Sequence, residues 1–201
     1  RAPRAKATAA ASTSTSDEAY AVAVQADGKI VVAGSSAGGD TLFAVVRFTE
    51  SGARDTSFGC ATPGLCVGAF TAFGGISNAV AQAVAIQPDG KIVAAGYAQV
   101  GATFDFAVAR YDSAGNPTWI RQLGTSGDDI AYAAAPDGSG GVYMGGNTTG
   151  SLGGPSSGLK DAWLARYSDC GALAYCTAKV NSQGCTPAMS ATGTSSATAG
   201  S

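Results

Sequence analysis

The chain has 201 residues, of which 45% are hydrophobic and 13% charged, and its formal net charge is −2. This length and apolar content allow a sizeable core, whereas the near-balanced charge and the lack of a basic stripe argue against nucleic acid binding. The absence of histidine excludes a Ser-His-Asp triad, a Cys-His pair and an imidazole metal ligand. No apolar run reaches the roughly 18 residues of a membrane span, and the 29 glycines suit an all-β protein rich in turns.

The beginning of the chain predicts no folded element. Residues 1–16 are small and polar and show no strand alternation, which is typical of a flexible linker. No signal peptide begins the chain, and its first residue is Arg1. We therefore expect a processed piece of a longer exported protein, in which any export signal lies upstream.

One hairpin pattern organises the rest of the chain and occurs three times. In residues 83–96, two short apolar strands flank an Asp89-Gly90 turn, a strong signal for a β-hairpin. Residues 21–34 repeat this pattern almost letter for letter, and residues 130–146 form a looser third copy in which Asp137-Gly138 is aligned with Asp89-Gly90. A hairpin pattern that occurs three times along one chain indicates a repeat architecture.

Each repeat is expected to hold four strands. In the first repeat they are 19–25, 29–34, 41–48 and 65–70. In the second they are 81–87, 91–97, 104–111 and 117–123. In the third they are 130–135, 141–146 and 162–167, and a fourth strand is placed at 172–177.

Four short antiparallel strands per unit are typical of the blade of a β-propeller. The small residues of the first strand in each repeat suit the innermost strand, where neighbouring sheets converge on an axis. We therefore predict an all-β, propeller-like fold of three four-stranded antiparallel blades, spanning about 17–71, 78–123 and 129–169. Typical propellers have about four to eight blades, so this one is either incomplete or completed by other sequence.

The motifs of the repeats resemble two known families. The pattern A-V-A-V-Q-x-D-G-K-I-V-x-A-G at 21–34, then F-A-V-x-R-[FY], then D-T-S-F-G at 55–59, resembles the "delta-sixty" class of bacterial propeller repeats. The segments 126–129, 141–146 and 161–167 of the third repeat resemble the related SBBP propeller repeat. The second repeat departs from the pattern, since N-P-T-W at 116–119 stands in place of D-T-S-F-G. The resemblance implies an extracellular or surface-attached binding scaffold in large bacterial proteins, and it implies no catalytic residues.

The five cysteines predict disulfides rather than a zinc site. None has the C-x-x-C spacing of a zinc ligand pair, and short-loop disulfides are common in exported proteins. The candidate pairs are Cys60 with Cys66 and Cys176 with Cys185, which leaves Cys170 free or paired elsewhere. Residues 170–201 are interpreted as a cysteine-containing junction followed by a tail rich in Ser, Thr and Ala.

Strand order predicts where a ligand site lies. In each blade, the loop between the first and second strands and the loop between the third and fourth strands lie at one end of the propeller. The loops between the second and third strands, and the loops between successive blades, lie at the other end. The latter loops vary in length, and functional residues favour variable loops on a rigid scaffold. The candidate ligand-binding residues at that end are Tyr97, Asp128, Asp129 and Asn147. The alternative is that the two aspartates form a solvated turn and that Tyr97 and Asn147 only pack on the surface.

Other charged residues have simple structural interpretations. Arg47, Arg110 and Arg166 recur on the third strands, where they either ring an anionic ligand or, as we expect, pair with turn aspartates or buried carbonyls in their own blades. The aspartates of the Asp-Gly turns are explained by turn geometry rather than by calcium. The chain has only two glutamates, Glu18 and Glu50, and neither has the apolar setting that a glycosidase acid needs.

The function that these patterns favour is a non-enzymatic extracellular or cell-surface binding or adhesion scaffold without cofactor or metal. Its expected partners are a protein or a glycan, and a second copy of the chain joined through open blade edges. The alternative is a structural protein that assembles into surface layers or fibres. A propeller lyase or hydrolase is the least favoured interpretation, because fold alone does not define activity.

Overall fold

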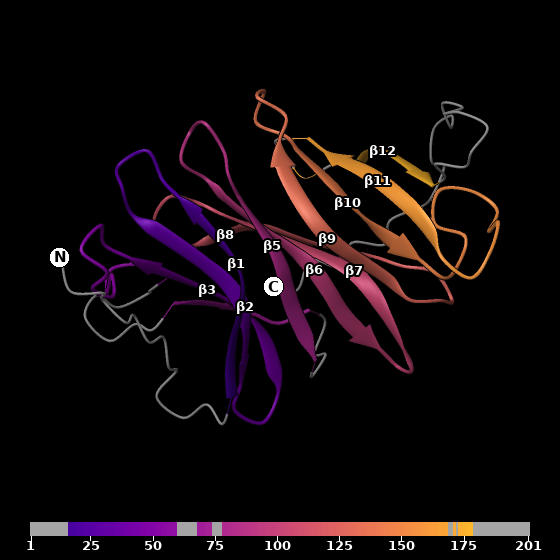
Figure 1. The fold of residues 1–201 in the computed structure, drawn as a ribbon, viewed down its shortest axis with the longest axis horizontal. Coiled ribbons are helices and arrows are strands. Elements are labelled where there is room, and N and C mark those ends of the chain that lie inside the picture. Colours follow the sequence, from indigo (N-terminus) through magenta and orange to yellow (C-terminus); the bar gives the residue numbers. More distant parts are fainter. Residues whose placement is uncertain (1–15, 60–67, 74–77, 169–170, 172, 179–201) are drawn as a thin grey trace, which may run out of the picture.

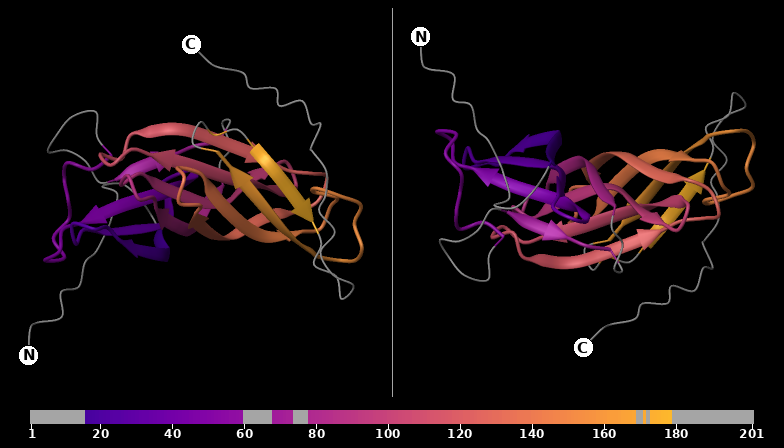
Figure 2. Two further views of the ribbon diagram at one scale, coloured as in Figure 1. Left: turned by 90° about the horizontal axis from the view of Figure 1, so that it is seen from above. Right: turned by 90° about the horizontal axis from the view of Figure 1, so that it is seen from below.

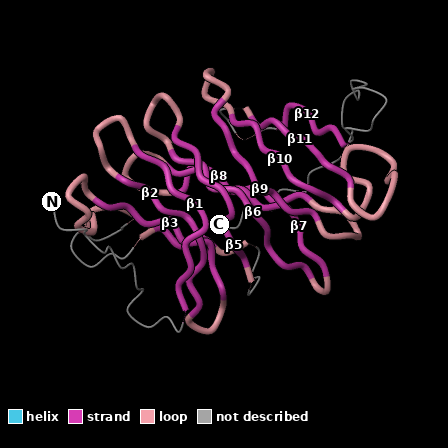
Figure 3. The backbone as a smooth tube through the Cα atoms, viewed as in Figure 1, coloured by secondary structure: helices cyan, strands magenta, loops and turns pink. Residues whose placement is uncertain are grey.

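The computed structural model describes residues 16–59, 68–73, 78–168, 171 and 173–178 (Figure 1). In this part of the chain all regular secondary structure is β-strand, joined by turns and loops (Figure 3). Within it, no helix is long and apolar enough to cross a membrane.

The strands form three antiparallel four-stranded sheets, called blades 1, 2 and 3. Blade 1 consists of β1 (Ser16–Val24), β2 (Ile30–Ala37), β3 (Thr41–Phe48) and β4 (Ala69–Thr71). Blade 2 consists of β5 (Ala79–Ile86), β6 (Ile92–Val100), β7 (Thr103–Tyr111) and β8 (Pro117–Leu123). Blade 3 consists of β9 (Asp129–Pro136), β10 (Val142–Thr148), β11 (Asp161–Tyr167) and β12 (Leu173–Ala178). The predicted fold class is confirmed, and the three sheets do not close into a ring.

Some predictions fall on residues that the structure does not describe. The proposed linker lies almost wholly outside the described residues, as do Cys60, Cys66 and Cys185. Cys170 also lies outside them, and although Cys176 lies on β12, its expected partner Cys185 is not described, so the disulfide pairings stay predictions. The first part of the strand expected at 65–70 is also outside them, and β4 begins at Ala69.

The hairpin turns are one residue longer than a two-residue Asp-Gly turn. The amide of Gln25 donates to the Lys29 carbonyl at 2.8 Å, and the amide of Gly28 donates to the Gln25 carbonyl at 3.0 Å. The loop therefore has three residues and ends on Gly28, whose φ of +79° favours glycine. Blade 2 repeats this geometry.

The third hairpin corrects the sequence alignment. Pro136 pairs with Val142 in blade 3 as Ile86 pairs with Ile92 in blade 2. Asp137 therefore occupies the position of Gln87, not that of the turn aspartate. The matching D-G letters misled the alignment, because the glycine richness of the third turn hides its register.

Each innermost strand carries one β-bulge. The extra residues are Tyr20 in β1, Gln82 in β5 and Tyr132 in β9. Opposite each bulge stands a glycine, at Gly34, Gly96 and Gly146. A Cβ atom added at any of these glycines would lie 1.8–2.0 Å from a carbonyl oxygen of the bulged strand. These glycines are therefore required by close backbone approach.

The blades pack face to face in chain order, with β1, β5 and β9 as neighbours (Figures 1 and 2). We call the side of a blade that meets the following blade its front face and the opposite side its rear face. The front face of blade 1 and the rear face of blade 2 enclose one apolar cluster, which includes Phe43, Val45, Ile92 and Tyr111. The front face of blade 2 and the rear face of blade 3 enclose a second one, including Phe106, Val108, Trp163 and Tyr167. Alternate residues of each central strand thus serve opposite interfaces.

Polar contacts also join successive blades. The guanidinium of Arg47, buried over the ring of Phe58, pairs with Asp55 at 2.8 Å and donates to the Ser113 carbonyl of blade 2. Arg110 donates to the Gly140 carbonyl of blade 3 at 3.4 Å. The expectation of partners within the same blade was therefore incomplete, because a blade this thin brings the next blade's turn within reach of the long side chain.

Candidate functional site: a tyrosine cluster on the innermost strands

The bulges present side chains where the three blades meet. Tyr20 is 45% exposed and Tyr132 is 49% exposed, although both lie between alanines on strands of small residues. In a regular strand, side chains point alternately to the two faces of the sheet, and here they pack against the adjacent blades. The extra residue of a bulge does not follow this alternation. The bulge positions of blades 1 and 3 therefore carry exposed side chains without disturbing either interface, whereas Gln82, at the bulge of blade 2, is partly buried.

Tyr20 contacts a residue of its own blade. Its hydroxyl donates a hydrogen bond to the carboxylate of Glu18. This hydrogen bond raises the pKa of Tyr20, and burial and the negative charges of Glu18 and Tyr97 raise it further, while Ser35 acts in the opposite direction. The Tyr20 hydroxyl is thus a neutral donor at physiological pH.

Tyr97 lies on β6, which pairs with β5 and packs against β9. Its ring packs edge-on against Phe104, with the ring centroids 4.9 Å apart. Burial raises the pKa of Tyr97, and so does repulsion from the ionised forms of Tyr132 and Glu18. We call Tyr20, Tyr97 and Tyr132 the tyrosine cluster, since each blade contributes one member and the strands that carry them, β1, β6 and β9, lie on or beside the packed innermost strands.

Asp128 and Asp129 hold loops together. The Asp128 carboxylate accepts the Phe104 amide at 3.1 Å, which links the β8–β9 loop to blade 2. Asp129 is fully buried, and its Oδ2 accepts the amide and hydroxyl of Thr125 at 2.6 and 2.9 Å. The structure therefore brings Asp128 to the Tyr97–Phe104 pair, whereas the Asp129 carboxylate does not reach the surface.

Asn147 stands at the register position of Tyr97. Each follows the glycine that faces the bulge in its blade, Gly146 and Gly96 respectively. Asn147 is partly buried, and its main-chain carbonyl accepts the indole Nε1–H of Trp163 at 2.9 Å. Because Trp163 occupies this carbonyl, a ligand contact made by Asn147 would come from its side-chain amide.

The expected variable loops of the first two blades are shorter than the sequence indicated. β2 and β6 extend further than predicted, so that only 38–40 and 101–102 remain as connections there. The connection between β10 and β11 is long, but Leu152 is buried in the second apolar cluster and Asp161 accepts two hydrogen bonds from Ser157. Its exposed tip includes Leu159, which is 92% exposed.

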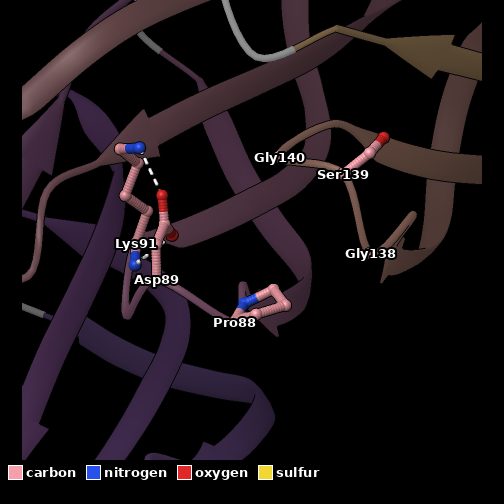
Figure 4. Close-up of a pocket in the computed structure, with 6 residues that line it drawn as sticks. All are labelled: Pro88, Asp89, Lys91, Gly138, Ser139 and Gly140. Atoms are coloured by element: carbon pink, nitrogen blue, oxygen red, sulfur yellow. Dashed lines mark hydrogen bonds and ion pairs between the residues drawn. The ribbon is translucent and has the colours of Figure 1, made fainter.

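A shallow pocket of about 310 Å³ lies at the β5–β6 and β9–β10 turns, at the other end of β10 from the β10–β11 connection (Figure 4). It is lined by two hairpin turns of adjacent blades, with Pro88, Asp89, Lys91, Gly138, Ser139 and Gly140. Asp89 forms an ion pair with Lys91, and the hydrogen bond from Lys91 lowers the pKa of Asp89 against the effect of partial burial. The Gly140 carbonyl already accepts Gln87 at 2.6 Å. The polar groups of this pocket therefore serve the junction between blades.

Sequence reasoning found Tyr97 but missed Tyr20 and Tyr132. The signal was present, because a polar or aromatic residue between two alanines recurs once per innermost strand, as Ala-Tyr-Ala or Ala-Gln-Ala. Strict strand alternation hid it, since only a bulge explains how such a residue fits. Among the described residues, no group of three His, Cys, Asp or Glu side chains is placed to hold a metal ion.

Stacked four-stranded blades joined through their faces define the class of β-propeller repeat proteins. Residues 25–58 and 87–117 match a beta-propeller domain of unknown function, DUF5122, and residues 118–154 match the SBBP beta-propeller repeat. The chain is therefore an SBBP-type β-propeller repeat protein. A search of curated proteins finds no match to it.

Proposed function

We propose that this protein is a non-enzymatic binding scaffold of the cell surface or extracellular space, and that the tyrosine cluster is its ligand site. The observation that carries the proposal is the exposure of Tyr20 and Tyr132 at bulges, where neither ring is needed for packing between blades. Tyrosine is favoured at binding surfaces because it combines a large apolar ring with a hydroxyl at low conformational cost.

The ligand class that fits best is a glycan. A pyranose has an apolar face of C–H groups and a rim of hydroxyls, and the cluster offers rings beside donors and acceptors. The carboxylate of Glu18, already bonded to Tyr20, is an acceptor for a sugar hydroxyl. The extracellular setting is what the resemblance to bacterial propeller repeats implies, and the lack of histidine in the chain supports a role other than acyl transfer.

The test is a glycan array, followed by titration of any glycan that binds. Replacing both Tyr20 and Tyr132 by Ala should weaken binding at least about tenfold, as expected when a contact residue of a binding site is truncated. Leu159→Ala is the matched control, because Leu159 is exposed and apolar but lies outside the cluster. Binding that survives the double substitution refutes the site, and a chain that binds no glycan but retains a protein partner in a pull-down refutes the ligand class.

A further inference from the structure

Asp129 is a fully buried aspartate with no counter-charge among the described residues. It is the first residue of β9, and no described Lys or Arg forms an ion pair with it. Its Oδ2 accepts two hydrogen bonds from Thr125, whereas its Oδ1 is buried and has no hydrogen-bond partner there. Ionised groups inside proteins are normally paired with an opposite charge or bound to a metal ion, because burying a bare charge is very costly. The Oδ1 atom therefore needs a partner that the described part of the chain does not supply.

Two more oxygen-bearing side chains lie beside Asp129 on the same face of blade 3. Thr148 of β10 pairs with Asp129 on one side and with Asp161 of β11 on the other (Figure 1). Side chains of directly paired residues lie on the same face of a sheet. Thr148 is 1% exposed and Asp161 is 9% exposed, and Asp161 shares its face with Trp163 of the second apolar cluster. The two aspartates therefore flank one hydroxyl on the buried side of the blade that meets blade 2.

Cationic side chains of the protein are not placed to neutralise this site within the described ranges. Lys160, the neighbour of Asp161 in the chain, is exposed. The other described Lys and Arg residues lie at the hairpin turns at the opposite end of the blades or bond to groups there: Lys29, Arg47, Arg54, Lys91, Arg110, Arg121 and Arg166. A bound cation is the remaining source of positive charge for Asp129.

We propose that Asp129, Thr148 and Asp161 bind a calcium ion. Calcium takes oxygen ligands from carboxylates, carbonyl groups and water, and two carboxylates match its double charge. Asp129 supplies Oδ1, and each carboxylate oxygen of Asp161 accepts one hydrogen bond from Ser157 and keeps a second lone pair for the ion. The described residues hold no group of three acidic ligands, so the Thr148 hydroxyl and water complete the coordination.

The ion would fasten three elements of blade 3 to one another. It joins β9 to β11 across β10, and Asp129 carries the connection on to Thr125 in the β8–β9 loop. The sequence favoured a scaffold without metal, because Asp161 lies far along the chain from Asp129 and only the strand register brings the two together.

Terbium, which takes the same oxygen ligands as calcium, reports binding to the full chain through luminescence sensitised by tryptophan. Trp163 is suited to this because it follows Asp161 by two residues on the same face of β11. Luminescence should rise as terbium is added and fall when calcium displaces it, with a calcium dissociation constant on the order of 0.1–1 mM, as in extracellular modules. Calcium at about ten times that constant should raise the thermal midpoint by about 3–6 °C.

Substitutions assign the ion to these residues. Asp129→Asn and Asp161→Asn keep the shape of each side chain but remove its charge, and each should weaken calcium binding at least about tenfold. Asp40→Asn is the matched control, because Asp40 is an exposed aspartate of the β2–β3 connection in blade 1, and it should leave the affinity unchanged. Circular dichroism confirms that the variants are folded.

Three outcomes would overturn the proposal. A wild-type chain that shows neither sensitised luminescence nor a calcium-dependent thermal midpoint leaves Oδ1 of Asp129 with a proton or a water molecule instead of an ion. Undiminished binding in both Asp129→Asn and Asp161→Asn places the ion elsewhere. An equal loss in the Asp40→Asn control indicates attraction to surface charge in general.

Discussion

The hydrogen bond between Tyr111 and Thr71 offers a direct test of how blades 1 and 2 are held together. The two hydroxyl oxygens are 2.6 Å apart, Tyr111 is fully buried, and Thr71 is 3% exposed. Burial raises the pKa of Tyr111 far above its ordinary value, so its hydroxyl stays protonated at any pH where the protein folds. The bond is therefore neutral and independent of pH.

Removing one partner should cost more than removing both. Tyr111→Phe leaves the Thr71 hydroxyl buried without its partner, and Thr71→Val does the same to the Tyr111 hydroxyl. Each single change should lower the free energy of unfolding by about 1–3 kcal/mol, the cost of an unsatisfied buried polar group. The double variant replaces both groups by apolar ones of similar shape, so its loss should be well below the sum of the two single losses.

Urea unfolding followed by circular dichroism measures these differences. With a urea dependence of about 2 kcal/mol per molar, a loss of about 2 kcal/mol lowers the midpoint by about 1 M. Fluorescence of Trp119 and Trp163, which lie in the second cluster, should give the same midpoint if the blades unfold together. A coupling energy indistinguishable from zero would refute the assignment of this hydrogen bond to the junction between blades.

Three further predictions concern the bulge, an acid-sensitive turn and the second cluster. Gly96→Ala places a Cβ 2.0 Å from the Val80 carbonyl oxygen and should cost about 3 kcal/mol in urea unfolding, whereas Gly154→Ala, with open space around it, should change stability by less than about 0.5 kcal/mol. Burial opposes ionisation of Asp137, but its hydrogen bonds, including that from Arg166, outweigh burial and lower its pKa from 3.8 to about 2; stability should therefore fall as pH drops from about 4 to 2, and Asp137→Asn should show a flatter pH profile over that window. Phe106→Ala removes a ring that is fully buried between blades 2 and 3 and should lower stability by about 3–5 kcal/mol, so a thermal midpoint equal to that of the wild type would contradict the packing described.

Local patterns were sufficient to predict the blades. The apolar runs around each Asp-Gly turn place two strands per repeat, and β5 to β8 all fall within a few residues of their expected positions. The register of the third turn was harder, because several glycines there permit more than one placement of the left-handed residue. The mistaken equivalence of Asp137 with Asp89 arose from this ambiguity.

The candidate site was only partly predictable. Tyr97 is the last residue of the strand expected at 91–97, so the sequence marked it, whereas Tyr20 and Tyr132 become exposed through bulges that depend on the glycine of the neighbouring strand. Asp129 looked exposed because paired aspartates usually are, but its carboxylate is buried where it accepts two hydrogen bonds from Thr125. Although Thr125 is only four residues away, a hydrogen bond within a loop produces no periodic pattern that the sequence would reveal.

The bulge has a consequence for how such a chain can diversify. Because the extra residues of β1 and β9 are exposed rather than packed between blades, mutation there should change what these strands display at little cost to folding. This chain carries Tyr, Gln and Tyr at the three positions. Duplication of a repeat would add one more such position, so the side chains displayed there can change one residue per blade while the strands around them are inherited unchanged.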